Sequence, residues 1–197
     1  MSATRLPGKP LLKVNGLSII SHVFKKAEKA NIGEVIVATE DQEIIDDVKK
    51  NGGRAILTKK QHQNGTDRIY EVLQRFNTSN IDLVMNLQGD EPLMDIGDIR
   101  NLHNQMVKTK SEMGTLASKI KDKSFFQKEN VVKVLTKQSL TNLEFPEAIN
   151  FMRKSGNLIE NVYHHLGIYC YKVEILKNFV SLNQSQNEIK NRLEQLR

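Results

Sequence analysis

Apolar residues in this chain follow two different patterns. One is a set of short runs rich in β-branched residues and of strand length, at residues 34–39, 54–58, 81–87, 114–120 and 131–135. The other is a recurrence every three or four positions, typical of amphipathic helices, across residues 19–30, 44–48, 69–76 and 96–108. Because such strands and helices alternate, we predict an α/β fold with a parallel sheet and right-handed crossovers.

The apolar run at residues 81–87 ends in Gln88-Gly89-Asp90-Glu91-Pro92. Ligands of open α/β sheets bind where the strands end, and a glycine there lets backbone and ligand approach closely. Mg²⁺ prefers one or two carboxylates together with phosphate oxygens and water. We therefore predict that Asp90 is a Mg²⁺ ligand at the mouth of the sheet. A polar turn that merely ends the strand explains this motif alone equally well.

The first ten residues, MSATRLPGKP, place Arg5 and Lys9 around a Pro-Gly pair. Two cations and exposed backbone donors in one loop suit the binding of a polyphosphate, although a flexible basic terminus is the commoner meaning of this composition. Gly65-Thr66 at a helix start offers free N–H groups and a hydroxyl to a base edge or a phosphate. Locally, an ordinary capped helix start is the simpler explanation of that second motif.

An aromatic, β-branched segment at residues 162–172 is predicted to be a strand. Period-two alternation places one set of polar-tipped residues on a common face, namely His165, Tyr169 and Tyr171, with Gly167 between them. That face suits the recognition of a hydroxylated, acidic small molecule. A half-exposed antiparallel strand with Tyr and His at its rim is the alternative.

Length and composition fit one globular domain. A chain of 197 residues is long enough for a single α/β domain covering residues 1–197. Within it, the weakly patterned residues 136–180 are predicted to be partly a small lobe or a dimerisation surface. The remaining periodicity predicts two further helices, at residues 173–179 and 188–197.

Charge and cysteine content narrow the function classes. The net charge of +6 comes from lysines spread among asparagines, so we expect no nucleic-acid partner, only steering of anionic small substrates. No apolar run is long enough to cross a bilayer, and no secretory signal pattern opens the chain. We therefore expect no membrane partner and a cytoplasmic location. The lone Cys170 is predicted to be a small buried side chain.

Seven short motifs occur in order along nearly the whole chain. They are ATRLPGKPL from Ala3, IVAT ending at Thr39, HQNGTDR at 62–68, NLQGDEP at 86–92, NVVKV at 130–134, HLGIYCY at 165–171 and LEQLR at 193–197. With these motifs the chain resembles the sugar-acid cytidylyltransferases, in particular those for 3-deoxy-manno-octulosonate (Kdo). The resemblance implies a Rossmann-like nucleotidyltransferase sheet with helices on both faces and a small antiparallel excursion.

The resemblance also implies a reaction and a set of site residues. The anomeric hydroxyl of Kdo would attack the α-phosphorus of CTP, giving pyrophosphate and CMP-Kdo for lipopolysaccharide synthesis. Catalysis is assigned to Arg5, Lys9 and Asp90, with Asp90 holding Mg²⁺ as the cofactor. Family positions assign the nucleotide to Arg5, Lys9, His62, Gly65, Thr66, Arg68 and Gln88, and the sugar to His165, Tyr169, Glu194 and Gln195. A homodimer is expected.

Two departures from the family pattern bear on activity. The family opens with an apolar strand before the Thr-Arg-Leu-Pro-Gly-Lys loop, and it continues past Arg197 to an aspartate that supplies a second metal ligand. We therefore expect the first strand and the C-terminal end to be missing, with a slot in the core. Two alternatives stay open: a cytidylyltransferase for another sugar acid of the acylneuraminate type, and a truncated, non-catalytic nucleotide-binding remnant.

Overall fold

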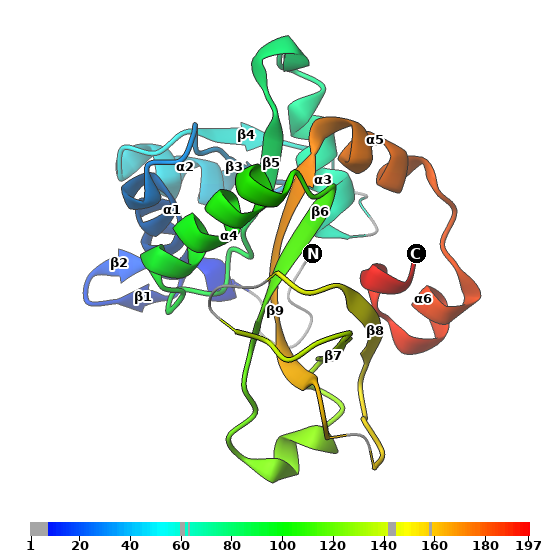
Figure 1. Ribbon diagram of the computed structural model, residues 1–197. Coiled ribbons are helices and arrows are strands. Elements are labelled where there is room, and N and C mark those ends of the chain that lie inside the picture. The colour runs from blue at the N-terminus through cyan, green and yellow to red at the C-terminus, as the bar shows by residue number, and fades with distance from the viewer. Residues whose placement is uncertain (1–7, 60–61, 63, 142–144, 158) are drawn as a thin grey trace.

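The computed structural model describes residues 8–197 except residues 60, 61, 63, 142–144 and 158. Four helices form where the periodic pattern predicts them (Figure 1): α1 (Ile19–Ala30), α2 (Gln42–Lys50), α3 (Gly65–Leu73) and α4 (Ile96–Thr109). Each begins at a side chain that accepts a hydrogen bond from a backbone N–H of the first turn, in order Ser18, Asp41, Asn64 and Asp95. The helix starts are therefore encoded locally.

The described strands form three sheets. Two are short pairs: β1 (Lys13–Val14) with β2 (Leu17–Ser18), antiparallel, and β3 (Val37–Thr39) with β4 (Ala55–Leu57), parallel. The third sheet contains β5 (Leu83–Asn86), β6 (Met113–Ser118), β7 (Lys133–Thr136), β8 (Ala148–Met152) and β9 (Val162–Lys172). The way in which the described strands divide into sheets does not test the prediction that the family's first strand is missing.

The long strand β9 organises the third sheet (Figure 1). Its first residues pair with β7 and its last residues pair with β5, while β6 pairs along β9 over both stretches. All three pairings are antiparallel. The prediction of a parallel sheet is confirmed for β3 and β4 and is wrong for the neighbour of β5. Strands β5 and β6 do run in the same direction around the α4 crossover, but β9 lies between them.

Helices cover both faces of β9, as the fold class predicts. On one face Ile99, Leu102 and Met106 of α4 pack with Ile168 and Cys170, and Cys170 is fully buried as predicted. On the other face, Leu73 of α3 and Leu176 of α5 (Val173–Ser181) pack against Tyr169 and Tyr171. Alternate residues of one strand thus enter two separate cores, which explains why both sets of residues in this segment are largely apolar or aromatic.

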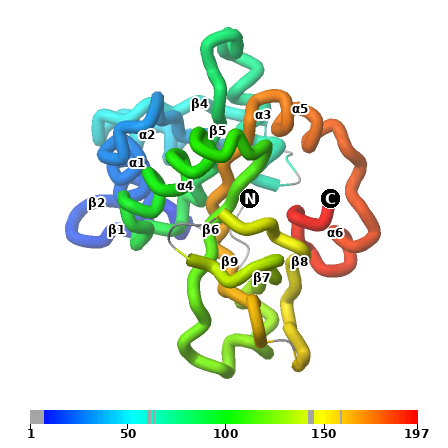
Figure 2. The backbone as a smooth tube through the Cα atoms, viewed as in Figure 1, coloured from blue at the N-terminus to red at the C-terminus, as the bar shows by residue number. Residues whose placement is uncertain are grey.

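The β7–β8 hairpin and the C-terminal segment lie together (Figure 2). Strand β8 forms within the weakly patterned part of the chain and pairs with β7, away from β5. The chain ends in α6 (Gln186–Asn191) and a 3₁₀ turn, η4 (Glu194–Leu196). The prediction of one helix over 188–197 is wrong, because Arg192 takes the left-handed conformation with φ 53° and ends α6.

Three further 3₁₀ turns occur in the described residues: η1 (Lys9–Leu11), η2 (Thr78–Asn80) and η3 (Lys123–Phe126). Of these, η1 matters for the site because it carries Lys9 beside α1. The backbone N–H of Ile19, the first residue of α1, donates to the carbonyl of Leu12 at 2.9 Å. No helix in the described part of the chain is long and apolar enough to cross a membrane.

Candidate active site

Two residues from distant parts of the chain form an ion pair beyond the carboxyl end of β5. Nζ of Lys9 lies 2.7 Å from Oδ2 of Asp90, and the two side chains are 35% and 46% exposed. The pair is therefore open to a ligand. This placement agrees with the sequence prediction, whereas the catalytic role of both residues stays a prediction. Arg5, the other predicted cation, lies outside the described residues.

Close packing fixes the backbone on which Asp90 sits. A Cβ atom on Gly89 would lie 2.9 Å from Cδ1 of Ile20 in α1. The backbone N–H of Glu91 donates to the carbonyl of Gln88 at 3.2 Å, which closes a turn around Gly89 and Asp90. Helix α1 therefore approaches this turn so closely that only glycine fits without displacement, and Asp90 is held on the side facing Lys9.

The N-terminus of α3 lies near the end of β5. Oδ1 of Asn64 accepts from the N–H of Asp67 at 2.8 Å and caps the helix. A Cβ on Gly65 would lie 3.8 Å from Nδ2 of Asn86, the last residue of β5. The Nδ2 atoms of Asn64 and Asn86 are both buried without a hydrogen-bond partner. The predicted turn at Gly65 and Thr66 is thus a capped helix start, and it also brings two unpaired amide donors together.

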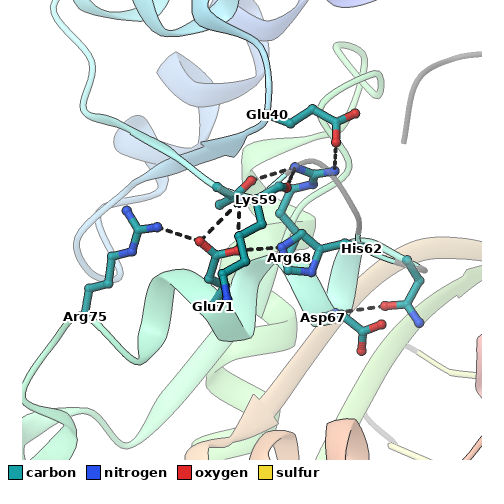
Figure 3. Close-up of polar contacts among 9 residues, drawn as sticks. Glu40, Lys59, His62, Asp67, Arg68, Glu71 and Arg75 are labelled. Carbon is teal, nitrogen blue, oxygen red and sulfur yellow. Dashed lines mark hydrogen bonds and ion pairs between the residues drawn. The ribbon is translucent and has the colours of Figure 1, made fainter.

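Arg68 is held by an acid and a hydroxyl (Figure 3). Its guanidinium donates to Glu40 at 2.9 Å and to Oγ1 of Thr58 at 2.6 Å, and the residue is buried. This hydrogen bond holds the pKa of the Glu40 carboxyl below its usual value. Arg68 therefore ties α3 to the ends of β3 and β4.

His62 is engaged in the same region, one turn of α3 further along (Figure 3). Its Nε2 lies 2.6 Å from Oε2 of Glu71, and the same carboxylate contacts Arg75 at 2.5 Å and the backbone N–H of Lys59 at 3.0 Å. Glu71 thereby ties Lys59 and His62 to α3. The nucleotide contact predicted for His62 and Arg68 stays a prediction.

Gln88 lies over the middle of β9. A Cβ on Gly167 would lie 3.3 Å from Cγ of Gln88, so the absence of a side chain at Gly167 leaves room for Gln88. Gln88 lies two positions after the end of β5 and two before Asp90. Its side chain therefore packs on the strand that carries His165 and Tyr169.

The polar face of β9 is buried. The rings of His165 and Tyr169 are 5.5 Å apart, and those of Tyr169 and Tyr171 are 6.0 Å apart, so these residues share a face as predicted. The alternative of a half-exposed strand is wrong, because the three are 6%, 2% and 0% exposed. Burial lowers the pKa of His165 to about 4, and Nε2 of its neutral ring lies 2.9 Å from Oγ1 of Thr115.

The turn η4 brings the last two predicted residues to this face. Oγ1 of Thr66 donates to Oε2 of Glu194 at 3.2 Å, and Nε2 of Gln195 donates to the hydroxyl of Tyr169. Burial raises the pKa of the Glu194 carboxyl and that of the Tyr169 phenol. The structure thus joins the two predicted halves of the site through Thr66 and Glu194, which are 128 positions apart.

Three residues of this region were not singled out as site residues from the sequence. Thr115, Glu40 and Asn86 contact or flank predicted site residues from β6, from the end of β3 and from the end of β5. Nothing local marks Thr115 or Glu40, since each acts through a partner at least 28 positions away. Asn86 does belong to the NLQGDEP motif, so its place in that motif was a signal that could have marked it as a site residue.

A hollow of about 520 Å³ lies apart from the Lys9–Asp90 pair. Its lining comes from α3, from the end of α5 and from the segment after it, among them Asp67, Asn183 and Arg197, together with His62, one of the predicted nucleotide residues. Neither Lys9 nor Asp90 lines it.

Among the described residues, no three His, Cys, Asp or Glu side chains gather to form a metal site. Asp90 alone offers an exposed carboxylate beside a cation at the end of β5. This donor set fits an ion such as Mg²⁺, which takes one or two carboxylates and completes its shell with phosphate oxygens and water. It does not fit a metal held by a cage of protein ligands.

Comparison with known proteins decides the family. A family model described as cytidylyltransferase matches residues 1–197. The chain belongs to the cytidylyltransferase family. The curated 3-deoxy-manno-octulosonate cytidylyltransferase of Nitrobacter winogradskyi is 41% identical over all of this chain and 78% of its own length. That of Thermodesulfovibrio yellowstonii is 40% identical over 99% of this chain and 81% of its own length.

Solved structures agree with the assignment of this chain to the cytidylyltransferase family. A structure of CMP:2-keto-3-deoxy-manno-octonic acid synthetase complexed with CTP superposes with a TM-score of 0.86 and 34% identity, over 98% of this chain and 79% of that one. A glucose-1-phosphate thymidylyltransferase structure from Bacillus anthracis matches with a TM-score of 0.63 and 17% identity. The second likeness shows the fold alone. The family resemblance and the fold class read from the sequence are confirmed.

Proposed function

We propose that this cytidylyltransferase transfers the cytidylyl group of CTP to the anomeric hydroxyl of Kdo, giving CMP-Kdo and pyrophosphate for lipopolysaccharide synthesis. The Lys9–Asp90 ion pair at the end of β5 is the observation that carries the proposal. It supplies one cation for phosphate and one carboxylate for a metal at the same exposed point. The choice of substrates is supported by the relatives, whose names specify this sugar acid. It is also supported by the similar solved structure, whose name specifies a synthetase complexed with CTP.

The phosphate end of CTP would lie at the Lys9–Asp90 pair. Lys9, with Arg5, would stabilise the negative charge that develops on pyrophosphate as the bond between the α-phosphorus and the bridging oxygen breaks. Asp90 would hold Mg²⁺. When bound there, the ion would orient the triphosphate and neutralise charge at the α-phosphorus. The carboxyl end of β5 is also where ligands of such sheets bind.

The nucleoside end would lie at the start of α3. Gly65 and Thr66 present the backbone donors of a helix N-terminus there, and the unpaired amide of Asn64 adds a donor. Arg68 and His62, which Glu40 and Glu71 hold in place, would bind the nucleotide beside this helix start.

The sugar acid would lie over the polar face of β9. His165 is neutral near pH 7, because its pKa is about 4. Its uncharged ring can therefore donate a hydrogen bond to a hydroxyl group of the sugar or accept one from it. Glu194 and Gln195 would bind further hydroxyl groups, and Tyr169 would orient Gln195. Gln88, which packs on Gly167 of β9, would bind the nucleotide beside this face, so that the anomeric oxygen can face the α-phosphorus. As the anomeric oxygen bonds to the α-phosphorus, the bond from phosphorus to pyrophosphate breaks and the proton of the hydroxyl passes to water.

The two alternative functions differ from this proposal in measurable ways. A cytidylyltransferase of the acylneuraminate type would use the same front loop with another sugar acid. A non-catalytic remnant would bind CTP without turnover.

A cytoplasmic location and a homodimer formed partly by residues 136–180 are also proposed. Exposed apolar side chains in that part, such as Ile149 at 58%, support the dimer, which sedimentation would detect.

Purified protein with CTP, Mg²⁺ and Kdo tests the proposal through pyrophosphate release. We expect release with Kdo and much slower release with an acylneuraminate. Asp90→Asn should reduce it by about 10²-fold or more, while Asp82→Asn, the same change at the exposed opposite end of β5, should leave it near the original rate. Release with the acylneuraminate alone would favour the first alternative, and CTP binding without release from either acid would favour the second.

A further inference from the structure

The turn η4 carries two predicted sugar contacts but cannot hold its own position. It consists of three residues, Glu194–Leu196, closed by two backbone bonds, from Leu196 N–H to Leu193 O at 3.1 Å and from Arg197 N–H to Glu194 O at 3.1 Å. A single 3₁₀ turn is unstable by itself in water. The placement of Glu194 and Gln195 must therefore come from contacts that η4 makes with other elements.

Arg197 makes the largest set of such contacts. Its Nε and Nη2 donate to the two carboxylate oxygens of Glu188 in α6, at 3.0 and 2.7 Å. Its Nη1 lies 3.5 Å from Oδ1 of Asp67 in α3, and its guanidinium carbon lies 4.9 Å from the ring centroid of Phe179 in α5. Only 2% of the side chain is exposed. One planar group therefore links η4 to three helices.

The other end of the segment is fixed independently. Arg153 donates to the backbone carbonyls of Asn191 at 2.6 Å and Arg192 at 2.9 Å, which are the acceptors left free where α6 ends. Ser185, the N-cap of α6, donates to the carbonyl of Leu196 at 2.5 Å. Helix α6 and η4 thus form one unit, and the Arg197–Asp67 contact ties it to the helix that carries Thr66.

We propose that Arg197 is a positioning residue for the sugar-acid half of the site: by joining α6, α5 and α3 it holds η4 so that Glu194 meets Thr66 and Gln195 meets Tyr169. This inference rests on the proposed function. The guanidinium of Arg197 is occupied by Glu188, Asp67 and Phe179 and is not offered to a ligand. Its effect on sugar binding would therefore pass through η4.

Arg197 also sets the electrostatic surroundings of Glu194. Burial raises the pKa of Glu194 most, and the charges of Asp67 on α3 and Glu188 on α6 raise it further, while Thr66 and the charge of Arg197 lower it. The phenols of Tyr169 and Tyr171 on β9 also face this region and remain neutral, because burial raises the pKa of each. Without the cation, Glu194 would face two acids and would stay protonated to a higher pH.

Steady-state kinetics of Arg197→Gln and Arg197→Lys test the proposal. In Arg197→Gln we expect the KM for Kdo to rise about tenfold or more, the KM for CTP to stay within about twofold, and the acidic fall in kcat/KM for Kdo to move to higher pH. Arg197→Lys keeps the charge and should restore the pH profile, but it should recover the KM only in part, because an ammonium cannot reproduce the two-pronged bond to Glu188.

A matched control separates positioning from general stability. Asp47→Asn weakens another partly buried cluster, in which Ser18 and Ser21 both donate to Oδ2 of Asp47, at a place with no contact to η4. It should lower the unfolding temperature without changing the KM for Kdo. Equal changes in both KM values in Arg197→Gln, or an unchanged KM for Kdo, would overturn the proposal and leave Arg197 a purely structural residue.

Amide hydrogen exchange gives a readout that does not depend on turnover. In Arg197→Gln the amides of Leu193, Leu196 and Arg197 itself (Gln in the variant) should exchange faster, while those of α1 stay unchanged. Unchanged exchange at residues 193–197 would overturn the positioning role even if the protein is active. Faster exchange there, in a protein that releases no pyrophosphate with any sugar acid, would refute the proposed function and leave the anchoring of η4 by Arg197 standing.

Discussion

The ammonium group of Lys9 contacts the carboxylate of Asp90 across 81 positions of sequence. Lys9 comes from a 3₁₀ turn that precedes α1, and Asp90 from the turn that follows β5. The two turns meet because α1 packs against both, through Leu12 on one side and Gly89 on the other. The geometry of this pair therefore depends on how closely α1 can approach the backbone at Gly89.

Replacing Gly89 with alanine should disturb this approach. The new Cβ would lie 2.9 Å from Cδ1 of Ile20, so the Ile20 side chain or the turn must shift, and overpacking of this kind costs about 1–3 kcal/mol. We expect Gly89→Ala to lower the free energy of unfolding by that order and to weaken CTP binding. Chemical denaturation and calorimetric titration with CTP measure the two effects.

A matched glycine separates the two effects. Gly33→Ala should leave both the free energy of unfolding and the affinity for CTP nearly unchanged, because a Cβ there meets no atom within 4 Å. If Gly89→Ala bound CTP as tightly as the original protein, the close approach of α1 would not be what positions Asp90.

The buried ammonium of Lys133 should be a major contributor to stability. Its Nζ donates to the backbone carbonyls of Lys128 at 2.6 Å, Val131 at 2.7 Å and Arg153, and no part of the residue is exposed. Burial lowers the pKa of this amine. Lys133→Met removes all three donors and leaves three carbonyls unsatisfied, so we expect a loss of about 3 kcal/mol in unfolding free energy.

The effect of Lys133→Met should be confined to the β7–β8 part of the molecule. Calorimetric titration should show CTP affinity within about twofold of the original, because Lys133 lies on β7 and contacts neither Lys9 nor Asp90. Lys137→Met is the control: it makes the same change, with the loss of the same charge, at a lysine whose side chain is 68% exposed. A stability equal to that of the control would show that the three carbonyls are not satisfied by Lys133.

His165 predicts a pH dependence of stability. Its pKa falls from 6.5 to about 4 on folding, first because of burial and then because of the neighbouring His164. A depressed histidine pKa contributes stability that is fully present above pH 6.5 and is lost as the pH falls toward 4. A shift of this size corresponds to about 3 kcal/mol over that range.

Denaturation at a series of pH values checks this prediction. The loss between pH 6.5 and 4 should shrink in His165→Gln, which removes the titrating ring, and should persist in His103→Gln, because the ring of His103 makes an exposed contact with Asn104. Proton NMR should show no titration of the His165 ring above pH 5. A His165 ring that titrates near pH 6.5 in the folded protein would contradict the account.

The elements that sequence reasoning placed correctly are those that local chemistry defines. The start of α1 at Ser18 and the position of Asp90 after Gly89 follow from a cap and from an apolar run with a glycine at its end. The shared face of His165 and Tyr169 follows from period-two alternation. Each of these signals lies within a few residues of the feature that it predicts.

The features that sequence reasoning misplaced depend on distant partners. The insertion of β9 between β5 and β6 is set by pairing between residues at least 46 positions apart, for which no local signal exists. The end of α6 at Arg192 carries no glycine or proline to mark it. The partners of Arg68 were likewise beyond local signals, because only the fold brings Glu40 and Thr58 to its guanidinium.

Pyrophosphate release from CTP and Kdo, measured for the original protein, Asp90→Asn and Lys9→Gln side by side, tests the central claim most directly. The account predicts release by the original protein and a loss of about 10²-fold or more in Asp90→Asn, with a higher KM for CTP in Lys9→Gln. Equal rates in all three proteins would contradict it, because the pair at the end of β5 would then have no part in the transfer of the cytidylyl group.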